Sequence, residues 1–172
     1  MRHILKLHRS LLEPIPQVSS SFDISTFNPP LQKAEWLELN NKIFIKHPDQ
    51  GNWVMADLEN RMAESWFDPE GFFIAMHNKK IIGFCWMKIH HDFVNQDPIG
   101  EIYVIGVDPE NKKTGLGKAL AITGLNYLNS KSLKQAMLYV DADNAAAMSV
   151  YTSLGFTPHH RELAFIGDVA AK

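Results

Sequence analysis

The stretch VDPENKKTGLGK (residues 107–118) joins an apolar, β-rich run at 101–107 to a helical run from Leu116 to about Asn129. A strand therefore leads into a short glycine-containing loop that opens a helix. The first N–H groups of such a helix lack intrahelical acceptors, and the helix dipole adds partial positive charge there. Gly115 and Gly117 have no Cβ, so the backbone can approach a ligand closely. The stretch predicts a pyrophosphate-binding loop, with further positive charge from Lys112, Lys113 and Lys118.

The spacing of the two glycines excludes the other common phosphate loops. A P-loop requires G-x-x-x-x-G-K-[ST], and a dinucleotide fold requires G-x-G-x-x-G. Neither pattern fits residues 107–118, where the loop follows V-x-P instead. Taken alone, the Gly-Leu-Gly segment is also compatible with a turn before an ordinary helix.

A second motif follows a short apolar strand at 138–140. Residues 143–156 read DNAAAMSVYTSLGF, in which Asp143 or Asn144 is a suitable helix N-cap. Gly155 is suited to end the helix as a left-handed residue. One apolar face of the predicted helix is formed by residues at i, i+3, i+4 and i+7, namely Ala147, Val150, Tyr151 and Leu154.

The two motifs together resemble the GNAT superfamily of N-acetyltransferases. The first resembles that family's pyrophosphate loop, V-x-P-x-x-[QR]-x-x-G-x-[GA], and the second its N-x-x-A…Y-x-x-x-G-F signature. The loop departs from the family pattern in having Lys112 at the Gln or Arg position, followed by Lys113 and Thr114. The resemblance implies that acetyl-CoA is the co-substrate and that no metal is needed.

Composition is that of an ordinary globular domain. The 172 residues are 45% hydrophobic and 21% charged, with a formal net charge of −2, which argues against a nucleic-acid surface. The single cysteine, Cys85, cannot form an intrachain disulfide and lies in an apolar run, as expected of a core residue in a reducing cytosol. No apolar run is long enough to cross a bilayer, and the first residues lack a signal-peptide core. We therefore predict a cytoplasmic protein that binds neither membranes nor nucleic acid.

The order of predicted elements places one GNAT domain at 21–172. The order is strand, two helices at about 31–46 and 55–66, three strands, then helix, strand, helix and a last strand at 160–165. It predicts an α+β (α/β) fold with a mixed, mostly antiparallel central sheet of about six to seven strands and helices on both faces. Residues 1–20 are predicted to be an N-terminal segment that ends in a linker, marked by Pro14, Pro16 and the serine run at 19–21.

Within the superfamily, residues 22–165 resemble the C-terminal, catalytic domain of the mycothiol synthase (mycothiol acetyltransferase) family. The resemblance rests on HPDQGNW at 47–53, WFDPEGF at 66–72, GEIYVIGVDP at 100–109 and LYVDADN at 138–144. Those enzymes are tandems of two GNAT domains, and residues 3–12 resemble the end of their first domain. The resemblance implies acetylation of the cysteinyl amine of Cys-GlcN-Ins in mycothiol biosynthesis.

Acetyl transfer to an amine needs a base for the amine and an acid for the departing thiolate. The resemblance assigns Glu101 as the base, acting through water, whereas a glutamate on an edge strand could equally be a solvent-exposed side chain. Tyr151 is the candidate acid, because its phenol can donate a proton to the CoA sulfur. Its place on the apolar helix face also suits core packing, and the two roles are compatible.

Cofactor contacts are expected from three segments. The backbone of Ile105, Gly106 and Val107 should pair with the pantetheine arm, next to a β-bulge that Gly106 would tolerate. The other two segments are the pyrophosphate loop, with Lys112, Lys113, Thr114, Gly115, Leu116, Gly117 and Lys118, and the far side of the cofactor site, with Asn144, Ala145, Ala146, Ala147, Met148 and Ser149.

The resemblance implies that the acceptor is bound by Asp49, Lys88 and Tyr139, in addition to Glu101 and Tyr151. A sugar–inositol ligand offers hydroxyls, which suit a carboxylate, an ammonium and a phenol. Asp49 stands where the family more often has Glu, and either Asp49 or Lys88 could simply be a turn residue or a solvated charge. Three further features are expected to be structural: the His90-His91-Asp92 run, which lacks metal-site spacing, the His159-His160 pair, and the four tryptophans.

The favoured function is therefore acetyl-CoA-dependent N-acetylation of a primary amine, by direct attack and without an acyl-enzyme. Two alternatives stay open: acetylation of a protein N-terminal amine, of the ribosomal-protein type, and a non-catalytic acetyl-CoA-binding module. GNAT domains often pair through their last strands, so the sequence also leaves open that two copies of this chain form a homodimer.

Overall fold

The computed structural model of the chain describes residues 2–18, 21–92 and 94–164. Ser19 and Ser20 of the predicted linker and Phe165 of the predicted last strand lie outside the described residues. The elements in chain order are β1 (Arg2–Ser10), β2 (Asp23–Thr26), α1 (Pro29–Ile43), α2 (Met55–Met62), η1 (Pro69–Gly71), β3 (Phe72–His77), β4 (Lys80–His90), β5 (Ile99–Val107), η2 (Pro109–Asn111), α3 (Leu116–Ser130), β6 (Gln135–Asp141), α4 (Ala145–Ser153) and β7 (Thr157–Ala164).

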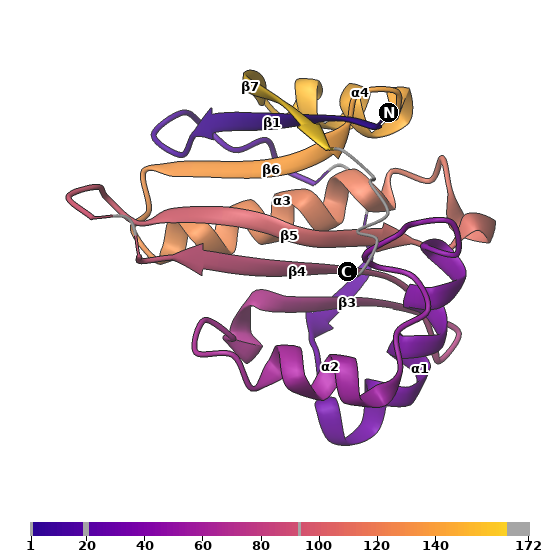
Figure 1. Cartoon of the computed structure of the whole chain (residues 1–172). Helices are drawn as coiled ribbons and strands as arrows, with labels where there is room; N and C mark the ends of the chain where they lie inside the picture. The colour runs from indigo at the N-terminus through magenta and orange to yellow at the C-terminus, as the bar shows by residue number, and fades with distance from the viewer. Residues whose placement is uncertain (1, 19–20, 93, 165–172) are drawn as a thin grey trace, which may run out of the picture.

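Seven strands form one sheet in the order β2-β3-β4-β5-β6-β1-β7. All neighbouring pairs are antiparallel except β5 and β6, which are parallel. Helices cover both faces (Figure 1). The predicted fold class, a mixed and mostly antiparallel sheet of six to seven strands between helices, is confirmed.

The two faces of the sheet bury different cores because successive strand residues point to opposite sides. On the α3 and α4 side, Cys85 and Met87 of β4 join an aliphatic core with Leu120, Leu125 and Leu138. On the α1 and α2 side, the core is aromatic. Its largest side chains, all fully buried, are Trp36, Phe72, Phe84 and Trp86.

The first strand occupies an interior position in the sheet. β1 lies between β6 and β7 and pairs with both, from Ile4 to Ser10 on one side and from Arg2 to His8 on the other (Figure 1). Leu7 and Leu11 are buried in the aliphatic core. The segment that the sequence suggests belongs to a preceding domain is thus a strand of this sheet, and the boundary at residue 20 stays a prediction.

Both N-terminal helices end earlier than their apolar patterns suggest. α1 stops at Ile43 rather than near Lys46, and α2 stops at Met62 rather than at Trp66. Pro48 follows α1 closely, and the chain leaves the helical conformation before it.

Asp68, the cap of η1, links this end of the domain to α3. Its carboxylate accepts from the Glu70 N–H at 2.9 Å and from the Tyr127 hydroxyl at 2.7 Å, and Lys131 Nζ lies 3.4 Å away. Burial acts to raise the pKa of Asp68, but the two hydrogen bonds and Lys131 hold it below its usual value. The ionised form is therefore the one that the folded state stabilises.

A carboxyl with a depressed folded-state pKa adds stability above its unfolded pKa of about 3.9 and loses it as pH falls through the folded-state pKa. We expect Asp68→Asn to lower the free energy of unfolding by about 1 kcal/mol at pH 7 and by much less near pH 3. Urea unfolding at both pH values measures this. Asp97→Asn, which removes an exposed partner of Lys134, is the control and should change little at either pH. If Asp68→Asn lowered the free energy of unfolding equally at both pH values, the expectation would be wrong.

Among the described residues, the structure contains no helix that is both long and apolar enough to cross a membrane.

Candidate active site

The central feature of the site is the separation of β5 from β6. The two strands pair only over Gly100–Ile102 of β5 and Ala136–Leu138 of β6. In the described part of the chain, β5 then runs on to Val107 and β6 to Asp141 without further pairing between them. The backbone groups on this side of residues 103–107, including the predicted contacts Ile105, Gly106 and Val107, are therefore not used by β6.

A β-bulge is present beside this opening, but not at the predicted residue. Trp86 of β4 pairs with Val104 and Met87 pairs with Ile102, so the extra residue of β5 is Tyr103. Gly106 instead pairs regularly with Phe84. A Cβ at Gly106 would lie 3.0 Å from Ile43 Cδ1 and 3.1 Å from the Phe84 ring, so close packing explains this glycine.

The predicted pyrophosphate loop follows β5 directly. Asp108 fixes its start, because the carboxylate accepts from the Glu110 N–H at 3.1 Å and from Lys42 Nζ of α1 at 2.9 Å. Gly115 is the N-cap of α3 with φ of 85°, and a Cβ there would meet nothing within 4 Å. The left-handed backbone of Gly115 thus turns the chain into the helix beside open space.

The side chains of the loop divide into two groups. Lys112, Lys113 and Thr114 are exposed, whereas Leu116 is buried in the core. Leu116 therefore has only its backbone to offer a ligand. The Thr114 hydroxyl donates to the Asn111 carbonyl at 2.8 Å and so closes the loop on itself.

The second motif helix begins as the sequence indicates. Of the two candidate caps, Asn144 is the one used, and its side chain accepts from the Ala147 N–H at 3.2 Å. Asn144, Ala145, Ala146 and Ser149 are exposed, while Ala147 and Met148 pack partly against the aliphatic core.

Tyr151 extends from α4 into the core. It is 7% exposed, and its ring packs edge-to-face on Phe156 at a centroid distance of 5.8 Å. Burial raises the pKa of its phenol strongly, and the nearby Cys85 thiol adds to the rise. Cys85 sits on β4 opposite Ile105 of β5. The predicted core packing is present, and the phenol stays in its neutral, proton-carrying form.

Cys85 is not suited to nucleophilic catalysis. It is fully buried, and burial raises the pKa of its thiol well above the usual range, so the thiolate is disfavoured.

Glu101 is a buried carboxylate rather than a solvent-exposed side chain. It is the third residue of β5 and is 7% exposed. Its Oε2 lies 2.6 Å from Nε2 of His90, the last residue of β4. The sequence interpretation assigned His90 only a structural role, so this partner was missed.

Lys88 of β4 is the register partner of Glu101 on the neighbouring strand β5. Its ammonium sits 4.7 Å from the Trp66 ring centroid and 5.8 Å from that of Tyr103. The guanidinium carbon of Arg61 of α2 lies 5.9 Å from the centroid of the same Tyr103 ring. Burial raises the pKa of Tyr103. The aromatic and cationic surroundings of Lys88 were also missed by sequence reasoning, which saw the tryptophans only as core.

The other two predicted acceptor residues lie on separate elements. Tyr139 of β6 is 43% exposed and stands opposite Lys6 of β1, whose ammonium is 5.6 Å from the ring centroid. Asp49 is exposed in the loop between α1 and α2, where its carbonyl accepts from Trp53 Nε1 at 3.0 Å. The structure thus brings Lys88 and Glu101 together and places Tyr139 and Asp49 on the surface.

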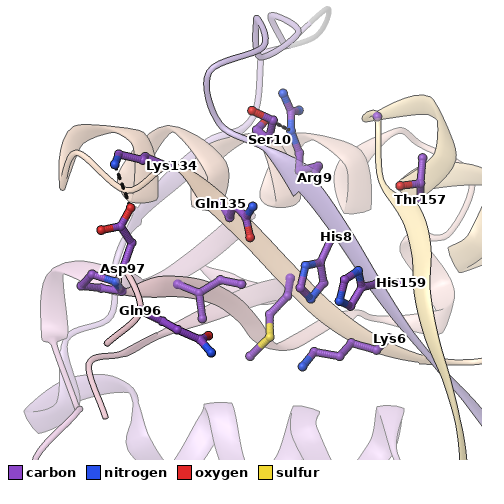
Figure 2. A pocket seen from close by; sticks show the side chains of 14 residues that line it. Lys6, His8, Arg9, Ser10, Gln96, Asp97, Lys134, Gln135, Thr157 and His159 are labelled. Carbon is purple, nitrogen blue, oxygen red and sulfur yellow. Dashed lines mark hydrogen bonds and ion pairs between the residues drawn. The ribbon is translucent and has the colours of Figure 1, made fainter. Parts of the chain in front are cut away.

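A groove of about 670 Å³ runs over β6, β1 and β7 (Figure 2). It begins beside the site, because its lining residue Met137 is the register partner of Glu101. Its lining is mixed, with both polar and apolar residues. Figure 2 shows two of the polar ones, His8 and His159, stacked face to face with a centroid distance of 4.1 Å. Other polar lining residues include Lys6, Gln96, Gln135 and Thr157.

No group of three or more potential metal ligands occurs among the residues that the structure describes.

Comparison with known proteins agrees with this geometry. Residues 33–156 match the family described as "Acetyltransferase (GNAT) family". The chain is 44% identical over 167 residues to a mycothiol acetyltransferase of Acidothermus cellulolyticus, and 41% identical over 175 residues to one of Nocardia farcinica. These alignments cover 90% and 98% of the chain but only 51% and 57% of the relatives, so the chain spans about half their length.

Solved structures share the fold. A GCN5-related N-acetyltransferase from Sphaerobacter thermophilus superposes with a TM-score of 0.74 at 22% identity, covering 93% of this chain and 49% of that one. The ribosomal-protein-S18-alanine N-acetyltransferase of Escherichia coli superposes with a TM-score of 0.62 at 23% identity, covering 80% and 78%. An aminoglycoside N-acetyltransferase solved in complex with CoA has a TM-score of 0.67 at 24% identity, covering 88% and 99%. By its family match and its fold, this chain belongs to the GNAT acetyltransferase family.

Proposed function

We propose that this chain is an acetyl-CoA-dependent N-acetyltransferase whose acceptor is the cysteinyl amine of Cys-GlcN-Ins, the product being mycothiol. The separation of β5 from β6, which begins just beyond the buried Glu101, is the observation that carries this proposal. The acceptor is inferred from the mycothiol acetyltransferases to which the chain is similar.

The open edge of β5 suits the donor substrate. The backbone of Ile105, Gly106 and Val107 would hydrogen-bond the amide groups of the pantetheine arm, as a further strand would. The loop at 112–118 would hold the pyrophosphate with its lysines and the first N–H groups of α3. The exposed first turn of α4, residues 144–149, would line the other side.

The transfer requires one proton acceptor and one proton donor. Glu101, directly or through a water, would take a proton from the ammonium of the acceptor, and the neutral amine would attack the thioester carbonyl. The C–N bond forms, the C–S bond breaks, and the Tyr151 hydroxyl would supply a proton to the departing thiolate. The second proton lost by the amine nitrogen would return to the Tyr151 oxygen, which leaves a neutral amide and a neutral phenol. Because the Cys85 thiol is buried and neutral, direct attack by the amine is favoured over an acyl-enzyme on that residue.

Polar groups on both sides of Glu101 suit a polyhydroxyl acceptor. Lys88 and Tyr139 would hydrogen-bond sugar and inositol hydroxyls, and Asp49 would do so from the loop between α1 and α2. The groove beside Met137 offers further donors and acceptors of the same kind.

A release assay tests the proposal. CoA release from acetyl-CoA is measured with Cys-GlcN-Ins, with a peptide that has a free N-terminal alanine, and with no acceptor. Release that requires Cys-GlcN-Ins is expected, and Tyr151→Phe should lower kcat about tenfold to a hundredfold while leaving stability near that of the wild type. Release only with the peptide would favour the N-terminal acetyltransferase alternative, for which the S18-alanine enzyme is a structural neighbour. Calorimetric binding of acetyl-CoA with no release on any amine would favour a binding module.

The pyrophosphate loop gives a second prediction. Any side chain at Gly115 must adopt φ of 85°, which costs about 1–2 kcal/mol, so Gly115→Ala should shift the loop and weaken acetyl-CoA binding about tenfold. Gly155→Ala is the matched control, because Gly155 has a similar φ of 84° and equally open space at its Cβ but follows α4, outside the loop. Calorimetry measures both dissociation constants. Equal weakening by the two substitutions would contradict the assigned role of Gly115.

A cytosolic location and a homodimer stay predictions.

A further inference from the structure

His90 lies where it can act on Glu101 without touching the substrates. It is the last residue of β4, two residues beyond Lys88, and alternate strand residues share a face. Because Lys88 pairs with Glu101 across the two strands, the imidazole of His90 reaches the carboxylate diagonally. The contact between Nε2 and Oε2 is 2.6 Å, and the two side chains are 15% and 10% exposed.

The proposed role of Glu101 sets the direction of this hydrogen bond. A base must be ionised before it takes a proton, and an ionised carboxylate can only accept, so Nε2 then carries the hydrogen and donates to Oε2. The second nitrogen, Nδ1, lies 3.9 Å from Oδ1 of Asp92, whose side chain is 85% exposed. His90 therefore stands between a buried carboxylate and a carboxylate at the surface.

The proposed reaction gives such a residue a task. Glu101 can act as a base only when one of its carboxylate oxygens faces the acceptor amine or its water. The side chain of Glu101 is nine-tenths buried, and a hydrogen bond to its other oxygen would hold the carboxylate in that orientation.

We propose that His90 is a positioning residue for Glu101. Its Nε2–H holds Oε2, which leaves Oε1 to meet the acceptor amine or its water. The inference rests on the proposed N-acetyltransferase function.

Other charged groups around this pair belong to the elements packed against it. Lys88 lies on β4, Tyr103 on β5, Arg61 on α2 and Glu64 just after α2. Lys88 and Arg61 are directed onto aromatic rings. His90 is the group for which the structure gives a direct hydrogen bond to the Glu101 carboxylate.

Kinetics of two His90 variants against a neighbouring control test the role. His90→Gln retains an N–H donor that can hold the carboxylate, and His90→Ala removes it. We expect kcat/KM to fall about tenfold to a hundredfold in His90→Ala and less in His90→Gln, with little change in acetyl-CoA affinity. His91→Gln, at the exposed next residue, should match the wild type.

Two readouts separate this role from a structural one. The acidic limb of the profile of log kcat/KM against pH should move to higher pH in His90→Ala and less in His90→Gln, because the N–H donor stabilises the ionised carboxylate. Added imidazole should restore part of the rate of His90→Ala. Uniform lowering of the profile without imidazole rescue, in variants that thermal unfolding shows to be folded, would overturn the positioning role.

A readout that needs no turnover keeps the proposal distinct from the function on which it rests. In NMR spectra of protein labelled with ¹⁵N-histidine, neutral His90 should be the Nε2-protonated tautomer, and this preference should weaken in Glu101→Gln. An unchanged tautomer in that variant would overturn the positioning role whatever the acceptor is. Absence of acetyl transfer by the wild type to any amine, with the tautomer as expected, would instead overturn the proposed function.

Discussion

Glu101→Gln is expected to lower kcat/KM for acetyl transfer by about a hundredfold or more, because the amide cannot take a proton from the acceptor. Glutamine has the same shape and can still accept from His90, so the strand pairing of β5 and the binding of acetyl-CoA should be kept. Steady-state kinetics, with calorimetric acetyl-CoA binding in parallel, measures the two effects separately.

Glu59→Gln is the matched control for this variant. Glu59 is an exposed residue of α2 that pairs with Lys33, so its neutralisation should leave kcat/KM within about twofold of the wild type. If Glu101→Gln retained wild-type kcat/KM, or lost activity only together with acetyl-CoA binding, Glu101 would not be the base.

Removal of residues 1–20 is expected to abolish the cooperative fold. β7 is attached to the sheet through β1, and β6 would be left as an open edge. The deletion also removes the buried side chains of Leu7 and Leu11. Burial of each is worth about 2–5 kcal/mol, and a domain of this kind has only about 5–15 kcal/mol of total stability.

Circular dichroism and urea unfolding of a protein that begins at residue 21 measure this effect. A synthetic peptide of residues 2–12 added to the shortened protein is the matched control and should restore the unfolding transition. A shortened protein with a cooperative transition at the wild-type midpoint would show that β1 is dispensable, and that the domain indeed begins at residue 21.

The features predictable from the sequence are those encoded locally. The glycine-containing loop at 107–118 and the Asn144-capped helix each depend on residues a few positions apart, and the strand-loop-helix order follows from them. Tyr151 on the apolar helix face followed from spacing alone. These local features sufficed for the fold class because they occur together and in this order.

The features that the sequence did not predict depend on pairing between distant segments. The interior place of β1 is set by its partners more than a hundred residues away, β6 and β7. The bulge was wrongly placed at Gly106 rather than at Tyr103, because a glycine that avoids Phe84 and Ile43 looks in sequence like one that permits a bulge.

The His90–Glu101 contact was missed for a related reason. It depends on the register of β4 against β5, which a bulge shifts by one residue and which the connecting loop does not reveal. The alternation Lys88-x-His90 on a strand was the available signal, because it places both side chains on one face.

The most direct test of the account is the identity of the product. The wild-type protein is incubated with Cys-GlcN-Ins and acetyl-CoA that carries a ¹³C-labelled acetyl group, and the acceptor and the protein are then analysed by mass spectrometry and NMR. The account predicts one labelled acetyl group in amide linkage to the cysteinyl nitrogen, formed only with protein present. Intact acetyl-CoA binding without labelled acceptor, or a labelled acetyl group retained on the protein, would contradict it.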